Sequence, residues 1–153
     1  MTEDYQIIHS LIESVLKKMD VEAKINLIQE ADLPMFAVIT DEAGILIGEN
    51  GQNLLSLFHI LKKMADKIFR EKNQKTPLFS VDINRYYAKK INSLKETAKM
   101  NAQRVRFFKK EIILEPMNSF ERRIIHTALS EYLDIKTESV GEGDDRQVVI
   151  KPI

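Results

Sequence analysis

The spacing of hydrophobic positions in the first half of the chain predicts alternating helices and strands. Apolar residues recur at helical spacing over residues 4–19 and again over residues 54–68. Apolar and polar residues alternate over residues 21–27 and 79–83, which is typical of half-buried strands. The continuous apolar run at residues 35–39 favours a more central strand. These patterns predict a helix, two strands, a second helix and a third strand.

The second half of the chain also predicts a mixture of helices and strands. An apolar stripe at helical spacing predicts a long helix over residues 87–105. A short strand is predicted at residues 112–114, and two strands at residues 135–140 and 147–150 are predicted to form a hairpin. The turn between them would be the segment 141–145, which contains two glycines.

These elements predict an α+β chain with two domains, residues 1–84 and residues 85–153, the second including the long helix. A further helix is predicted to begin at Asn118 or Ser119, because Asn118 with Glu121 fits a capping box.

The charges are unevenly distributed along the chain, although its 23 basic and 23 acidic residues balance. Between residues 85 and 110 Glu96 is the only acid, and this segment carries the following basic residues: Arg85, Lys89, Lys90, Lys95, Lys99, Arg104, Arg106, Lys109 and Lys110. Such a segment favours binding to a polyanion, and a solvated helix face is the alternative.

Composition narrows the function classes further. The chain of 153 residues is 44% hydrophobic and 30% charged, which is typical of a folded protein. It has no cysteine, so disulfides and thiolate metal sites are excluded. The acidic N-terminus and the lack of a long apolar run predict a cytoplasmic protein without a transmembrane segment. No arrangement of nucleophile, base and orienting group is recognisable, so we expect no enzyme and no cofactor.

The first motif is a Gly-x-x-Gly loop formed by Gly48, Glu49, Asn50 and Gly51. Because helical spacing begins at Leu54, the loop is expected to open a helix, whose free backbone N–H groups and positive dipole end suit a phosphate. The loop and its flanking elements resemble the KH domain, and the preceding helix and strand resemble its type II arrangement. The resemblance implies that this loop clamps a nucleic-acid backbone. A helix-entry turn kept for packing or for a protein contact is the alternative.

The second motif places Arg122 and His126 four residues apart on one helical face. An arginine fork can hold a phosphate with two hydrogen bonds, and an imidazole can donate to another phosphate oxygen. The spacing resembles the R-three-H domain, named for Arg-x-x-x-His. We expect Arg123, Arg146 and Lys151 to assist in holding the phosphates.

The order of the two motifs is similar to the Jag family of bacterial RNA-binding proteins over about residues 21–153. This resemblance implies a type II KH-like module joined by the long basic helix to an R-three-H module with a small sheet. It also implies single-stranded RNA as the partner, with single-stranded DNA as a further candidate, and a role in cell shape regulation.

Glu49 leaves a second hypothesis open, because an acid facing a phosphate weakens binding. In that hypothesis the chain is a protein-interaction adaptor. Its KH surface would pair with a second copy of the chain or with a small KH partner protein instead of RNA.

Overall fold

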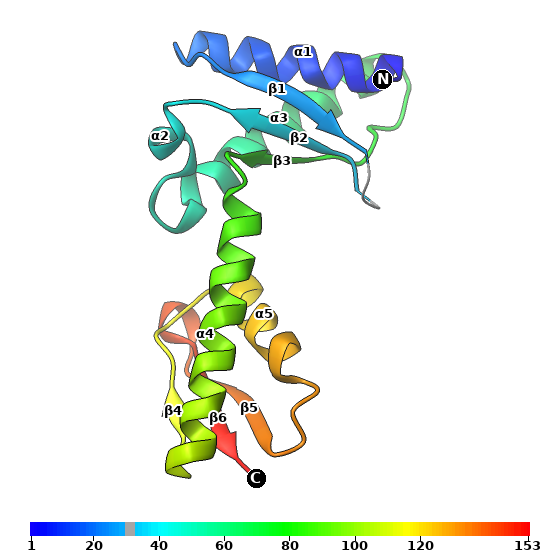
Figure 1. The fold of residues 1–153 in the computed structure, drawn as a ribbon. Helices are drawn as coiled ribbons and strands as arrows, with labels where there is room; N and C mark the ends of the chain where they lie inside the picture. Colours follow the sequence, from blue (N-terminus) through cyan, green and yellow to red (C-terminus); the bar gives the residue numbers. More distant parts are fainter. Residues whose placement is uncertain (30–32) are drawn as a thin grey trace. The chain divides into compact units, whose positions relative to one another are not determined.

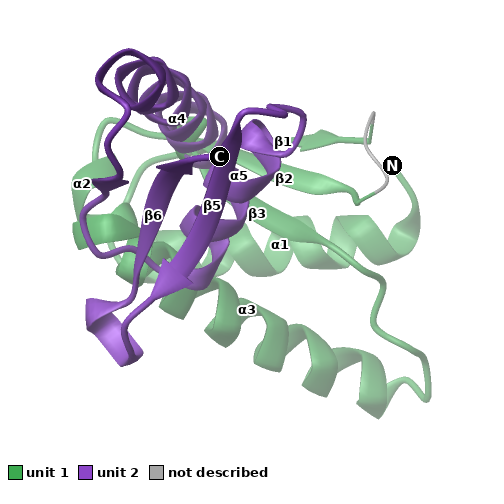
Figure 2. Ribbon diagram, turned by 90° about the horizontal axis from the view of Figure 1, so that it is seen from below, with its two compact units in different colours: residues 1–86 green, residues 87–153 purple. Residues whose placement is uncertain are grey.

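The computed structural model describes residues 1–29 and 33–153. The chain divides into two compact units, Met1–Tyr86 and Tyr87–Ile153 (Figure 2). Each unit contains its own three-stranded sheet, so the α+β prediction is confirmed. Whether the chain folds as two separate domains that meet at residue 84 stays a prediction. No helix in the described part of the chain has the length and apolar character to cross a membrane.

Unit 1 has the order of elements expected of a type II KH-like module. In chain order (Figure 1) it contains α1 (Glu3–Lys18), β1 (Lys24–Ile28), β2 (Met35–Ile39), α2 (Ala43–Ile47), the 3-10 helix η1 (Glu49–Gly51), α3 (Gln52–Glu71) and β3 (Ser80–Ile83). The sheet order is β1-β2-β3, in which β2 is antiparallel to β1 and parallel to β3. The apolar run at residues 35–39 therefore forms the central strand, as its pattern predicted.

The core of unit 1 lies between its sheet and the helices α1 and α3 (Figures 1 and 2). Phe36 and Val38 of β2 are almost fully buried, whereas Ile39 at the end of the strand is 53% exposed. The alternation along β2 shows that one face of the sheet carries most of the packing.

The strand predicted from residue 21 begins later, at Lys24, because Val21 caps the C-terminal end of α1. The backbone N–H of Val21 donates to the carbonyl of Leu16 at 3.0 Å, and Asp20 before it has a φ of 58°. This geometry is a helix C-terminal cap, and Val21 is buried without belonging to β1.

Unit 2 packs two helices on one face of a small antiparallel sheet. Its elements are α4 (Tyr86–Phe108, of which the first residue falls in unit 1), β4 (Ile112–Ile113), α5 (Ser119–Leu129), β5 (Ile135–Val140), the 3-10 helix η2 (Gly143–Asp145) and β6 (Gln147–Pro152). The sheet order is β4-β6-β5. Its core combines Ala102 of α4, Ile125 of α5 and Ile150 of β6, each fully buried.

The start of α5 is fixed by the predicted capping box. Asn118 Oδ1 accepts from the backbone N–H of Glu121 at 2.9 Å, and Glu121 Oε2 accepts from that of Asn118 at 3.0 Å. The same carboxylate forms an ion pair with Lys90 Nζ at 2.9 Å. Because Lys90 lies on α4, this carboxylate both caps α5 and connects it to α4.

Candidate nucleic-acid interface

The Gly-x-x-Gly loop connects α2 to α3 and depends on both of its glycines. Gly48 has a φ of 69°, and a Cβ built there would lie 2.4 Å from Asn53 Cγ. Asn53 Nδ2 donates to the carbonyl of Ile45 at 2.8 Å, and this bond links α3 to α2 across the loop. Gly48 therefore provides the space that Asn53 needs.

Gly51 is buried, and it lies in the left-handed region with a φ of 76°. A Cβ built at Gly51 would lie 2.9 Å from Cε1 of the Tyr86 ring. The backbone N–H of Gly51 donates to the carbonyl of Gly48 at 3.3 Å, and that of Gln52 donates to the carbonyl of Glu49. The expectation of open N–H groups at this helix start is therefore wrong for Gly51 and Gln52, because the tight turn uses them.

Replacing Gly51 by alanine is expected to lower the free energy of unfolding of unit 1 by about 2–3 kcal/mol, because it adds left-handed strain and a clash with the Tyr86 ring. Urea denaturation followed by circular dichroism measures this change. Gly44→Ala is the matched control, because a Cβ at Gly44 meets nothing within 4 Å and the site is helical. An equal loss in both variants would contradict the packing role of Gly51.

Met117 links the side chain of Arg122 to the backbone of Arg146. Arg122 Nη1 donates to the carbonyl of Met117 at 2.6 Å, and the N–H of Met117 donates to the carbonyl of Arg146 at 3.1 Å. Arg122 is half-buried, whereas Arg123 and Arg146 are exposed. Among the described residues, no further hydrogen bond or ion pair is found for these three guanidinium groups. We call Arg122, Arg123 and Arg146 the arginine group.

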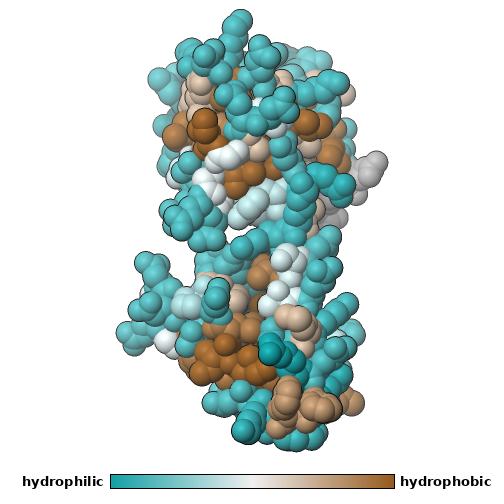
Figure 3. All heavy atoms as spheres, turned by 60° about the vertical axis from the view of Figure 1, so that its left-hand side comes forward, coloured by the Kyte–Doolittle hydropathy of each residue, from teal (hydrophilic) through white to brown (hydrophobic). Residues whose placement is uncertain are grey.

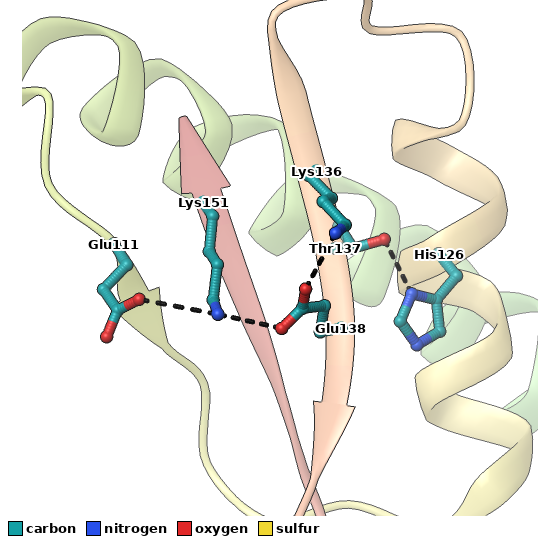
Figure 4. A network of polar contacts seen from close by, with 6 residues as sticks. All are labelled: Glu111, His126, Lys136, Thr137, Glu138 and Lys151. Atoms are coloured by element: carbon teal, nitrogen blue, oxygen red, sulfur yellow. Dashed lines mark hydrogen bonds and ion pairs between the residues drawn. The ribbon is translucent and has the colours of Figure 1, made fainter. Parts of the chain in front are cut away.

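His126 ties α5 to β5. Its Nδ1 lies 2.7 Å from Thr137 Oγ1 and its Nε2 lies 2.8 Å from Ser139 Oγ (Figure 4 draws the first contact). The expectation that this imidazole donates to a phosphate is not supported in this conformation, because both ring nitrogens already contact hydroxyls. Burial and, to a smaller extent, the Arg122 charge lower the pKa of His126. The ring is therefore neutral at pH 7, donating to one hydroxyl and accepting from the other.

Lys151 does not join the arginine group, because it lies on the opposite face of the sheet from His126. Successive side chains of a strand alternate between faces, so Lys136 and Glu138 point away from the face of Thr137, and Lys151 pairs in register with Lys136. Lys151 Nζ lies 2.8 Å from Glu138 Oε2 and 3.9 Å from Glu111 Oε2 (Figure 4). Hydrogen bonds from Lys151 and Lys136 lower the pKa of Glu138.

Two of the basic residues of α4 are neutralised in the same way. Lys90 pairs with Glu121, and Arg106 forms two hydrogen bonds with Asp134 at 2.6 and 2.7 Å. The other cations of α4 are exposed to solvent: Lys89, Lys95, Lys99 and Arg104.

Sequence reasoning missed the residues that complete unit 2 around the motif. Thr137 and Ser139 hold His126, and Glu138 neutralises Lys151. The period-2 alternation of residues 135–140 was a signal that could have placed Thr137 and Ser139 on the α5 face. No signal in the sequence connects Arg122 with Met117, because that bond depends on how the segment before α5 runs.

Comparison with known proteins gives one domain match and several relatives. Residues 92–152 match the family model of the R-three-H domain. The chain is 36% identical to RNA-binding protein KhpB of Clostridium symbiosum over 110 residues, covering 72% of this chain and 48% of that protein. It is also 36% identical to RNA-binding protein KhpB of Bacillus subtilis strain 168 over 146 residues, covering 94% of this chain and 66% of that protein.

The R-three-H match spans α5, β5 and β6, and it therefore includes the arginine group and His126. The chain covers about half to two thirds of the length of these two relatives, and the longer of the two alignments includes unit 1 as well. With a KH-like unit followed by an R-three-H domain, the chain belongs to the Jag family of bacterial proteins.

Proposed function

We propose that the chain binds single-stranded RNA, without catalysis, chiefly through the arginine group of unit 2. The observation that carries this proposal is that Arg122, Arg123 and Arg146 have no acid paired to them among the described residues, while the Arg122 side chain and the Arg146 backbone both bond to Met117. The names of the relatives support RNA as the partner, since both are called RNA-binding proteins.

The bond to Met117 gives Arg122 a defined role in this proposal. A guanidinium has five N–H donors, and the bond to Met117 uses one of them. The side chain is thereby held in one orientation before any ligand arrives, which lowers the entropy lost when it binds a phosphate. Arg123 and Arg146 then contact neighbouring phosphates of the same strand. His126 is a positioning residue, which holds α5 and therefore Arg122 against β5.

The Gly-x-x-Gly loop is a second contact in this proposal. Glu49 and Asn50 form its exposed tip, where a ribose-phosphate chain would lie against the backbone. Its contribution is expected to be smaller than that of the arginine group, because Glu49 repels phosphates and the turn uses two of the N–H groups.

Salt dependence of binding tests the proposal directly. Three arginines and one exposed lysine of α4 would neutralise about four phosphates, for which the slope of log K against log salt is about −3. Fluorescence anisotropy with labelled single-stranded RNA and DNA 12-mers measures that slope. A flat response contradicts the proposal. A chain that binds neither probe and elutes as a dimer would instead favour the protein-interaction adaptor.

A further inference from the structure

Two aromatic side chains at the end of α4 are exposed to solvent. Phe107 is 81% exposed and Phe108 is 61% exposed. Figure 3 shows hydrophobic side chains on the surface of unit 2, in the lower half of the view, bordered by hydrophilic ones. Exposed aromatic rings placed side by side indicate a binding surface, because their burial stabilises a complex more than that of any other apolar side chain.

The local backbone fixes where these rings lie. The N–H of Lys109 donates to the carbonyl of Val105 at 2.9 Å, and Lys109 has a φ of 56°, so the helix ends there in a left-handed residue. The two ring centroids are 5.0 Å apart with an angle of 84° between the planes. The two rings therefore lie in edge-to-face contact and form one aromatic surface at the end of α4.

The surroundings of this pair are cationic. Arg104, Lys109 and Lys110 are exposed, and no acid occurs between Glu96 and Glu111. Arg106 adds no net charge, because it is bonded to Asp134 and stacks at 4.7 Å from the Tyr132 ring centroid. Glu111 lies within 3.9 Å of Lys151, so its charge is balanced as well.

We propose that Phe107, supported by Phe108, is a stacking platform for one unpaired base, and that Arg104, Lys109 and Lys110 hold the adjoining phosphates. The proposal rests on the function proposed above and extends it to the end of α4, outside both sequence motifs. One base is expected because the ring planes are nearly perpendicular, so two successive bases cannot lie flat on both rings. Phe107 carries the base because it is the more exposed ring.

The chemistry around the rings favours a nucleic acid over a protein. Base stacking on aromatic side chains combined with a positively charged groove is the usual arrangement for single strands. Protein interfaces, in contrast, are depleted of lysine around their buried apolar centre. The aromatic pair with its neighbouring cations matches the first pattern.

The test compares the parent with a double variant that combines Phe107→Leu and Phe108→Leu. Each protein is measured with two 12-mer probes. One probe is single-stranded RNA, and the other has the same ribose-phosphate backbone without bases. The leucines keep the apolar surface but remove the flat rings. The parent is expected to bind the base-bearing probe more tightly than the abasic one. In the double variant the ratio of these two affinities is expected to fall about tenfold, which is the lower part of the range for one stacked base.

A reporter variant adds a direct signal. The chain contains no tryptophan, so Phe107→Trp introduces a single indole. Its indole is expected to stack on a base in place of the phenyl ring, and therefore to lose fluorescence on binding the base-bearing probe but not the abasic one. Ile113→Ala is the matched control, since Ile113 is 55% exposed in the same unit without being aromatic, and it should leave both affinities unchanged.

The outcomes separate this inference from the proposed function. If the parent binds no RNA, the proposed function fails and this inference fails with it. If the parent binds RNA and the leucine variant shows the same preference for bases, only the stacking platform is overturned. It is also overturned if the leucine variant loses both probes equally, or if Phe107 and Phe108 affect self-association and leave RNA binding unchanged.

Discussion

Replacing Arg122 and Arg123 together by alanine is expected to weaken binding of a single-stranded RNA 12-mer by about 10- to 100-fold. Each hydrogen bond from a charged guanidinium to a phosphate contributes about 1.5–3 kcal/mol at most, and neighbouring interactions are not fully additive. The slope of log K against log salt should also become less negative by about 1.4, from about 0.7 for each phosphate that the variant no longer neutralises. Fluorescence anisotropy at several salt concentrations measures both quantities.

The matched control removes the same charge from the opposite face of the sheet. Lys136→Ala combined with Lys151→Ala also deletes two cations, but these residues contact Glu138 and lie away from α5. This variant is expected to bind RNA within about threefold of the parent, since long-range effects of surface charges are screened. If both double variants weaken binding equally, net charge and not the arginine group determines affinity.

Replacing His126 by alanine is expected to lower the free energy of unfolding of unit 2 by about 2–3 kcal/mol. The change removes two hydrogen bonds between α5 and β5, and it leaves the Thr137 and Ser139 hydroxyls without their partner. Urea denaturation measures the decrease. At a temperature where the variant is folded, its RNA affinity should stay within about fivefold of the parent, because α5 is still held by its capping box and by Lys90. A large drop in affinity at unchanged stability would instead make His126 a direct RNA contact.

The pH dependence of stability provides a separate check on His126. Burial lowers the pKa of His126 in the folded state below its ordinary value of 6.5, so the unfolded chain binds the proton more readily. The contribution of His126 to stability is therefore complete above pH 6.5 and decreases as the pH falls from there toward the lowered folded-state pKa. The lowered pKa values of Asp134 and Glu138 act only in a more acidic range. Between about pH 7.5 and 5.5, the parent should lose stability and the alanine variant should lose less.

The neutral state of His126 has a consequence for how the arginine group would act. An uncharged ring beside Arg122 leaves the positive charge at the start of α5 concentrated on the guanidinium groups. A phosphate bound there would favour the protonated imidazole, because an opposite charge nearby raises the pKa of a histidine. RNA binding and protonation of His126 are therefore expected to reinforce each other, although burial of the ring opposes protonation.

Local patterns in the sequence determined most of the secondary structure. The helical spacing after the Gly-x-x-Gly loop predicted α3, the apolar run at residues 35–39 predicted the central strand β2, and Asn118 with Glu121 predicted the start of α5. The same spacing placed Arg122 and His126 on one helical face. These features depend on residues within one or two turns of each other, so they can be predicted directly from the sequence.

Tertiary structure alone decided what the site residues contact. Lys151 carries the same charge as Arg146, yet strand register places it opposite Lys136 and beside Glu138, away from α5. The need for glycine at position 51 comes from the Tyr86 ring, which is 35 residues later in the chain. His126 matches the motif in spacing, but its nitrogens meet Thr137 and Ser139 of another element. Periodicity specifies the face of a helix or strand on which a residue lies, whereas its partners depend on which other element packs against that face.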